Sequence, residues 1–183
     1  MLTDQQTRKL AHLFRIYDHD GNGFVERDDF ERVLRALAAA RGWAAGHPRY
    51  ERLRTLYLAQ WQALAVGAIP AGSGRVPLPG WYALWNALLQ AAYPERVAAL
   101  CEVLFESMDA DGDGAITLDE SRSWFAAYAG DAAEADVVFP RCDLDGDGRM
   151  TRAEWLTLIE EFFFGSDPNA PGNLIFGRMK ERT

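Results

Sequence analysis

The sequence predicts an all-α fold in which four helix–loop–helix units form two pairs and pack as one compact globule. The first observation is a twelve-residue acidic pattern that occurs three times, at residues 18–29 (loop 1), 109–120 (loop 3) and 143–154 (loop 4). The second is the helical spacing of apolar residues on both sides of each loop. The third is size, because 183 residues that are 49% hydrophobic can bury a substantial core.

The three loops place oxygen-bearing side chains where a calcium ion requires them. The first, third and fifth positions carry carboxylates or an amide, the eighth is apolar and the twelfth is acidic. A calcium ion takes about six to eight oxygens at about 2.3–2.6 Å, so a short peptide must curl around it. A glycine at the sixth position, Gly23, Gly114 or Gly148, permits that turn because it has no Cβ. The spacing therefore predicts three calcium sites.

The expected ligands follow the order of positions in each loop, and the seventh residue contributes its backbone carbonyl. In loop 1 they are Asp18, Asp20, Asn22, the Phe24 carbonyl, Glu26 and Asp29. In loop 3 they are Asp109, Asp111, Asp113, the Ala115 carbonyl, Thr117 and Glu120. In loop 4 they are Asp143, Asp145, Asp147, the Arg149 carbonyl, Thr151 and Glu154. The two threonines are expected to act through a water.

Loop 1 differs from the other two at its last ligand. Asp29 stands where loops 3 and 4 have glutamate, and its side chain is shorter by one methylene. Bidentate closure on a large ion is harder with the shorter side chain, although Glu26 at the ninth position offers partial compensation. We therefore expect about three bound Ca²⁺ ions, two of them tight, with a weaker or Mg²⁺-tolerant site in loop 1.

The last glutamate of loops 3 and 4 has a second interpretation. Thr117 with Glu120, and Thr151 with Glu154, also match the capping box that begins a helix. Each glutamate would then hold backbone N–H groups instead of a metal ion. The two roles are compatible, and the sequence does not choose between them.

Apolar residues recur at helical spacing in eight segments, two for each unit. They are Leu10, Leu13, Phe14 and Tyr17; Phe30, Val33, Leu34 and Leu37; Leu53, Leu56, Tyr57, Trp61 and Leu64; Trp81, Leu84, Trp85 and Leu88; Val97, Leu100, Leu104 and Met108; Trp124, Phe125 and Tyr128; Val138, Phe139 and Cys142; and Trp155, Leu158, Ile159 and Phe162. Thr3 with Gln6 predicts the start of the first helix. Residues 42–48 are expected to be a connector, and a turn is expected near Gly130.

A fourth, degenerate loop is predicted at residues 69–80 (loop 2). If Val76 takes the eighth position, Gly74 falls at the sixth, as in the acidic loops. The first, third and twelfth positions have become Ile69, Ala71 and Gly80, and Ser73 is the one side-chain oxygen left at a ligand position. We expect this loop to bind nothing and to survive as the structural partner of loop 1.

The chain order of the loops predicts how the units pair. Loops 3 and 4 begin 34 residues apart, which leaves room for one exiting helix, a turn and one entering helix, so these loops should lie side by side. We expect an N-terminal pair at residues 1–92, a C-terminal pair at residues 93–164, and a tail at residues 165–183 that packs on the core.

Charge and composition exclude several classes of function. The formal net charge is −8, and three bound dications would neutralise most of it. Since no basic stripe is visible, a nucleic-acid role is excluded. No secretory signal and no apolar run long enough to span a bilayer are evident, so a cytoplasmic location is expected. Cys101 and Cys142 are expected to be small core residues rather than a disulfide or zinc ligands.

The pattern of one acidic loop, one degenerate loop and two acidic loops, followed by the tail, resembles the EF-hand calcium-binding proteins of the sarcoplasmic family and their prokaryotic relatives. The resemblance covers nearly the whole chain. It implies two EF-hand pairs that pack on each other, and a role as a cytoplasmic calcium buffer or carrier. Asp29 departs from the glutamate that this family usually has at that position.

A calcium sensor is the main alternative to a buffer. A sensor exposes a hydrophobic groove, often rich in methionine, when metal binds. This chain has four methionines and six tryptophans, and its tail carries Leu174, Ile175 and Phe176, which are suited to lie in its own groove. A groove that the chain fills with its own tail favours a buffer. We expect a monomer, and the sequence does not identify a protein target.

The same order of units also resembles the calcium-triggered photoproteins, which hold a chromophore in a central cavity. Such chemistry requires histidines among the cavity aromatics, and the three histidines here are His12, His19 inside loop 1 and His47 in the connector. The chain ends at Thr183 after a charged stretch, unlike the apolar tail of those proteins. No nucleophile and base arrangement is evident elsewhere, so we do not expect an enzyme.

Overall fold

The computed structural model describes residues 1–68, 74–91 and 95–179. Within these ranges the helices are α1 (Asp4–Tyr17), α2 (Arg27–Ala40), α3 (Pro48–Ala68), α4 (Leu78–Ala91), α5 (Glu95–Met108), α6 (Leu118–Ala129), α7 (Glu134–Cys142) and α8 (Arg152–Phe164). The strands are β1 (Phe24–Glu26), β2 (Arg75–Pro77), β3 (Ala115–Thr117) and β4 (Arg149–Thr151), and the short 3₁₀ helix η1 is Pro171–Leu174. The predicted all-α fold of paired helix–loop–helix units is confirmed.

The loops meet through two short antiparallel ribbons. β1 pairs with β2 so that Val25 lies opposite Val76, and β3 pairs with β4 so that Ile116 lies opposite Met150. All four side chains are buried. These residues hold the eighth position of their loops, so the register confirms the alignment of loop 2 with the acidic loops. Ile69, Ala71 and Ser73, the other predicted features of loop 2, lie outside the described residues.

The start of α1 and the end of α6 lie where short sequence patterns predict them. Thr3 and Gln6 form a capping box at the start of α1, in which Gln6 N–H donates to Thr3 Oγ1 at 3.1 Å. Gly130 ends α6 with a φ of +72°, in the left-handed region that glycine adopts without a Cβ clash. The turn that follows leads directly into α7.

The two pairs repeat one another in their tryptophans. The indole of Trp81, the first residue after loop 2, donates to the Leu10 carbonyl at 3.0 Å. The indole of Trp155, the first residue after loop 4, donates to the Cys101 carbonyl at 3.1 Å. Leu10 and Cys101 each precede the first residue of an acidic loop by eight positions. Both pairs therefore use the same bond between the last helix and the first.

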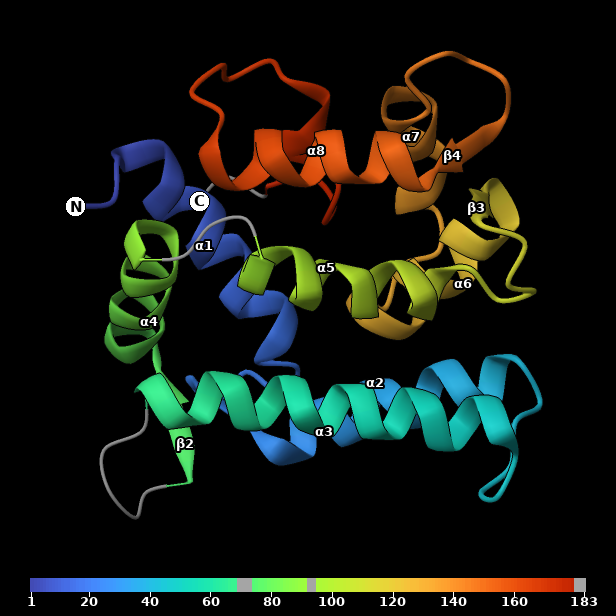
Figure 1. Ribbon diagram of the computed structural model, residues 1–183, viewed down its shortest axis with the longest axis horizontal. Helices are drawn as coiled ribbons and strands as arrows, with labels where there is room; N and C mark the ends of the chain where they lie inside the picture. The colour runs from blue at the N-terminus through green and yellow to red at the C-terminus, as the bar shows by residue number, and fades with distance from the viewer. Residues whose placement is uncertain (69–73, 92–94, 180–183) are drawn as a thin grey trace.

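One continuous hydrophobic core joins the pairs. Tyr17 of α1 meets Tyr128 of α6 with ring centroids 5.6 Å apart, and it also contacts Trp81 at 5.5 Å. Contacts of α2 with α6, α3 with α5, and α1 with α8 cross the same boundary. In Figure 1, α5 accordingly lies between α8 and α3. Cys101 and Cys142 are free and buried in this core, as predicted. Among the described helices, none is both long and apolar enough to cross a membrane.

The segment after α8 folds back onto it. η1 packs against α8 and α7, and Ile175 and Phe176 are buried. The ring centroids of Phe176 and Phe162 are 4.8 Å apart. The backbone carbonyl oxygen of Phe176 lies 2.9 Å from Nε2 of His12 on α1. A Cβ on Gly172 would lie 2.3 Å from the Leu158 carbonyl, so this close approach requires glycine.

Candidate metal centres

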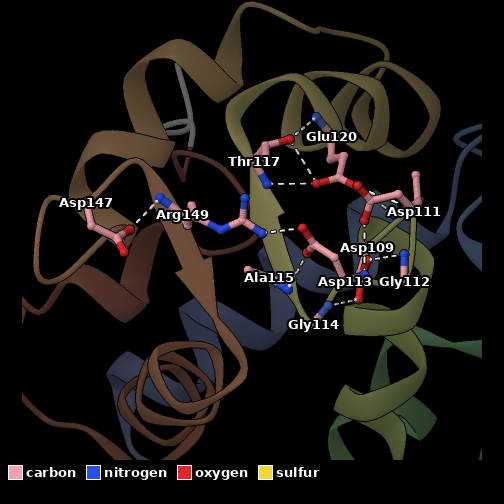
Figure 2. A network of polar contacts seen from close by, with 11 residues as sticks. Asp109, Asp111, Gly112, Asp113, Gly114, Ala115, Thr117, Glu120, Asp147 and Arg149 are labelled. Atoms are coloured by element: carbon pink, nitrogen blue, oxygen red, sulfur yellow. Dashed lines mark hydrogen bonds and ion pairs between the residues drawn. The ribbon is translucent and has the colours of Figure 1, made fainter.

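Loop 3 brings three carboxylates together between α5 and α6 (Figure 2). One carboxylate oxygen from each of Asp109, Asp111 and Glu120 lies within 4.8 Å of the others. Asp109 accepts hydrogen bonds from the amides of Gly112 at 2.7 Å and Gly114 at 3.0 Å. Gly114 has a φ of +89°, so the turn at the sixth position is the one that the sequence predicts. The loop backbone therefore fixes the first carboxylate at the centre of the loop.

Glu120 joins the two ends of loop 3. Its Oε2 accepts from the Thr117 amide and the Thr117 hydroxyl, both at 2.8 Å. Its Oε1 accepts from the Ala110 amide at 2.7 Å. The predicted capping box of α6 is thus present. Since this glutamate also belongs to the carboxylate group of the loop, its position suits both of the roles that the sequence leaves open.

Loop 4 resembles loop 3, except that its carboxylate group includes the fifth residue of the loop instead of the twelfth. Its grouped carboxylates are those of Asp143, Asp145 and Asp147, again within 4.8 Å of one another. Glu154 caps α8 through the Thr151 amide at 2.7 Å and also accepts from the Leu144 amide at 2.8 Å. Burial alone would raise the pKa of Glu154, but these hydrogen bonds outweigh it and lower the pKa. Glu154 is therefore held as a charged carboxylate.

Asp113, the fifth residue of loop 3, faces the neighbouring loop. Its Oδ1 accepts from the Ala115 amide at 3.0 Å, and its Oδ2 is paired with the guanidinium of Arg149 from loop 4 (Figure 2). The hydrogen bond from Arg149 lowers the pKa of Asp113. The amide of Arg149 donates to Asp147 at 2.8 Å. Arg149 thus contacts the fifth residue of both loops.

Loop 1 has the same turn with a more buried last residue. Asp18 Oδ2 accepts from the Gly23 amide at 3.0 Å. Asp18 Oδ1 is buried and has no hydrogen-bond partner among the described residues. Asp29 is 2% exposed and accepts from the Glu26 amide at 2.8 Å. Burial raises the pKa of Asp29.

The remaining predicted ligands lie in or beside the same loops. Asp20 and Asn22 accept hydrogen bonds within loop 1, and Glu26 stands at the end of β1 just before α2. Phe24, Ala115 and Arg149, which are expected to offer carbonyls, begin β1, β3 and β4. All of the expected ligand atoms are oxygens, which calcium prefers as a hard cation. The Asp18 oxygen that has no hydrogen-bond partner is available to bind a metal ion. The residues of the three loops therefore fit a calcium ion.

Contacts to loop 3 from the N-terminal half have no counterpart in the sequence predictions. Arg41, just after α2, donates to the Met108 carbonyl at 3.2 Å. Arg49 of α3 donates to the Ala110 carbonyl and, at 2.8 Å, to the Asp111 carbonyl. These arginines lie about 60 residues before their partners, and neither stands in a motif. Arginines of the N-terminal pair therefore hold the start of loop 3, which belongs to the C-terminal pair.

Comparisons with known families agree with this geometry. Residues 9–41 match the EF-hand domain family, and residues 102–123 match a second family described as EF hand. The first match includes loop 1, most of α1 and all of α2, and the second includes loop 3 with the adjoining parts of α5 and α6. With the paired ribbons and acidic loops, they show that the chain contains EF-hand units of the calcium-binding type.

Two known proteins are similar to this chain over nearly its whole length. Calerythrin of Saccharopolyspora erythraea is 28% identical over 169 residues, which are 90% of this chain and 96% of calerythrin. The luciferin-binding protein of Renilla reniformis is 25% identical over 177 residues, or 94% of this chain and 93% of that protein. The predicted resemblance to the sarcoplasmic calcium-binding proteins and their prokaryotic relatives is confirmed.

Solved structures share the fold. A calcium-binding protein of Streptomyces coelicolor aligns with a TM-score of 0.70 and 29% identity over 86% of this chain and 97% of that chain. The amphioxus sarcoplasmic calcium-binding protein aligns with a TM-score of 0.70 and 20% identity over 97% and 99% of the two chains. The calcium-loaded coelenterazine-binding protein of Renilla muelleri aligns with a TM-score of 0.73 and 24% identity over 96% and 99%. The last two show similarity of fold alone.

Proposed function

We propose that this protein is a calcium buffer or carrier inside the cell, with about three sites in loops 1, 3 and 4. The observation that carries the proposal is the fixed first carboxylate of each acidic loop. Asp18, Asp109 and Asp143 each accept from the sixth-position glycine amide, at 3.0, 3.0 and 2.8 Å. Loops 3 and 4 are thereby closed around grouped carboxylates whose charge a dication neutralises, and loop 1 has the same turn with one unpartnered oxygen on Asp18.

The strengths of the sites follow from their last residues. In loops 3 and 4 the twelfth residue is a glutamate whose two oxygens already face the loop interior and the start of the exiting helix. In loop 1 the shorter Asp29 is buried, and burial raises its pKa and so disfavours the charged form that binds metal. We therefore assign the two tight sites to loops 3 and 4, and the weaker or magnesium-tolerant site to loop 1.

The buried tail supports a buffer over a sensor. Phe176 is 1% exposed and contacts Trp155, Phe162 and Phe163 of α8. Arg178 holds the far end of the tail through two-nitrogen contacts with Glu134 at 2.9 to 3.2 Å. A groove filled by the chain itself leaves less apolar surface for a target. The sensor remains the alternative to be tested.

The positions of the histidines do not favour chromophore chemistry of the photoprotein kind. His12 is hydrogen-bonded to the tail at the Phe176 carbonyl, His19 is exposed in loop 1, and His47 is exposed and stacks on Trp43. We therefore propose metal binding without catalysis.

Calorimetric titration of the full chain with calcium tests this proposal. We expect about three sites per chain, with millimolar magnesium displacing calcium from one of them and leaving the other two. A stoichiometry of one or fewer would contradict the proposal. A hydrophobic dye added in parallel separates buffer from sensor, because strong dye binding that requires calcium would indicate a sensor.

A further inference from the structure

One residue takes part in both C-terminal loops. Arg149 is the seventh residue of loop 4, where its backbone carbonyl is an expected ligand. Its guanidinium reaches across to Asp113, the fifth residue of loop 3 (Figure 2). Arg149 on β4 lies opposite Thr117 on β3, so its side chain extends back along the ribbon to reach Asp113, which precedes β3. The side chain and the backbone of Arg149 therefore belong to different sites.

Loops 3 and 4 differ at the residue that Arg149 engages. In loop 4 the fifth-position carboxylate, Asp147, lies within the group of carboxylates that surround the centre of the loop. In loop 3 the equivalent Asp113 is not part of the corresponding group, which consists of Asp109, Asp111 and Glu120. The two loops have the same acidic residues at positions one, three, five and twelve. The side chain of Asp113 pairs with the Arg149 guanidinium, whereas that of Asp147 accepts from the Arg149 amide. The groups also differ at the twelfth residue, because Glu120 belongs to its group and Glu154 does not.

A contribution to folding does not account for this ion pair. The side chains of Arg149 and Asp113 are 43% and 41% exposed, and an ion pair at such exposure stabilises a fold by about 0–1 kcal/mol. A fixed positive charge beside a cation site has a larger consequence, because it repels the ion and occupies one of its ligands.

We propose that Arg149 sets the calcium affinity of loop 3, by holding Asp113 as an internal counter-ion with which the metal must compete. This inference rests on the proposed function, since it concerns the affinity of one of its sites. It makes loop 4 the tighter of the two C-terminal sites. It also couples them, because an ion in loop 4 that binds the Arg149 carbonyl restrains the residue whose side chain faces loop 3.

The test replaces Arg149 by glutamine in the full chain. Arg149→Gln keeps the backbone carbonyl for loop 4 and removes the charge that faces loop 3. The amides of Gly114 and Gly148 donate to the first carboxylate of their own loops, so their NMR signals follow the two sites separately during a calcium titration. We expect the calcium affinity reported by Gly114 to rise by roughly three- to tenfold, and that reported by Gly148 to change by less than about twofold.

Arg122→Gln is the matched control. Arg122 lies on α6 next to loop 3, is 42% exposed and pairs with Asp119 and Asp136, neither of which is an expected ligand. It removes the same charge from the same half, and we expect the Gly114 titration to stay within about twofold of wild type. Arg149→Lys retains a positive charge and should lie between wild type and Arg149→Gln.

Three results would overturn the inference: an unchanged Gly114 titration in Arg149→Gln, a weaker one, or an equal change in Arg122→Gln. They differ from failure of the proposed function, in which the wild-type chain itself shows no calcium response at Gly114 and Gly148. Circular dichroism of each variant without added calcium checks that the fold is retained.

Discussion

The N-terminal and C-terminal pairs share a framework but differ in their metal chemistry. Both have a two-stranded ribbon with apolar residues paired at its centre, and both have a tryptophan that donates to the first helix of the pair. The C-terminal pair carries two acidic loops, whereas the N-terminal pair carries one. The framework therefore does not depend on ligands in both loops. The features that both pairs retain are the sixth-position glycine, the eighth-position apolar residue and the tryptophan.

The largest expected effect comes from removing the last ligand of a tight site. Glu154→Gln keeps the size of the side chain and removes the charge that loop 4 holds through Thr151 and Leu144. Calcium affinity at loop 4 should fall on the order of 100-fold, because affinity depends on ligand charge and bidentate closure. The Gly148 amide in a calcium titration measures it. Glu160→Gln, at an exposed position on α8, is the control and should bind as wild type does.

The framework itself is tested at the loop that is expected to bind nothing. Val76 is 0% exposed and pairs with Val25 of loop 1, so Val76→Ala opens a cavity beneath the ribbon. The free energy of unfolding should fall by about 1–3 kcal/mol, measured by urea denaturation. Val137→Ala, at a position that is 45% exposed, should change it by less than about 0.5 kcal/mol. Equal losses in the two variants would show that the ribbon of the N-terminal pair adds little to the fold.

Restoring the usual last residue should make loop 1 more like loops 3 and 4. Asp29→Glu adds the methylene that bidentate closure requires, and we expect the ratio of calcium to magnesium affinity at loop 1 to rise by about tenfold. The Gly23 amide reports this site, because it donates to Asp18. Asp28→Glu, an exposed neighbouring substitution, should leave the ratio unchanged. A lower ratio in Asp29→Glu would mean that burial, and not length, decides the selectivity.

The smallest expected effect is a difference in acid sensitivity between the loops. Burial raises the pKa of Asp29, whereas hydrogen bonds lower the pKa of Glu154 despite its burial. As the pH falls, Asp29 takes up its proton first, and loop 1 should lose calcium at a higher pH than loop 4. Titrations at a series of pH values, followed at Gly23 and Gly148, measure the two midpoints. Coincident midpoints would contradict this order.

The same shift fixes the sign of a stability effect when no calcium is added. A raised folded-state pKa means that the folded chain binds the proton of Asp29 more readily than the unfolded chain. Between the ordinary and the raised pKa, the contribution of Asp29 therefore favours folding at the lower pH and is lost as the pH rises. Asp29→Asn should remove this dependence in urea denaturation at pH values across that window.

The parts of the fold that the sequence predicts correctly depend on local patterns. With Val76 at the eighth position of loop 2, Gly74 falls at the sixth, and the pairing of Val76 with Val25 confirms this alignment. Thr3 and Gly130 mark helix ends because they satisfy or terminate backbone hydrogen bonds within a few residues. Such signals need no knowledge of distant residues. The ligand sets of the three loops are predicted in the same way and await the titrations above.

Contacts between distant polar residues were not predictable in this way. A lysine on a helix usually faces solvent. Lys9, however, is 1% exposed, and its ammonium donates to the Glu161 and Gly165 carbonyls at the end of α8. Arg49 reaches loop 3 across the boundary between the pairs. The side chain of Arg149 is the third case, since the sequence assigns a role to its carbonyl alone. In each case the tertiary fold determines the partner of the side chain, and no local sequence pattern predicts it.

The most direct test is the number of calcium ions that the purified chain retains in equilibrium dialysis at neutral pH, with free calcium well above the expected dissociation constants. We predict about three ions for the wild-type chain and about one for a chain carrying both Glu120→Gln and Glu154→Gln. Retention of no calcium by the wild-type chain, or of an equal number by the double variant, would contradict the account.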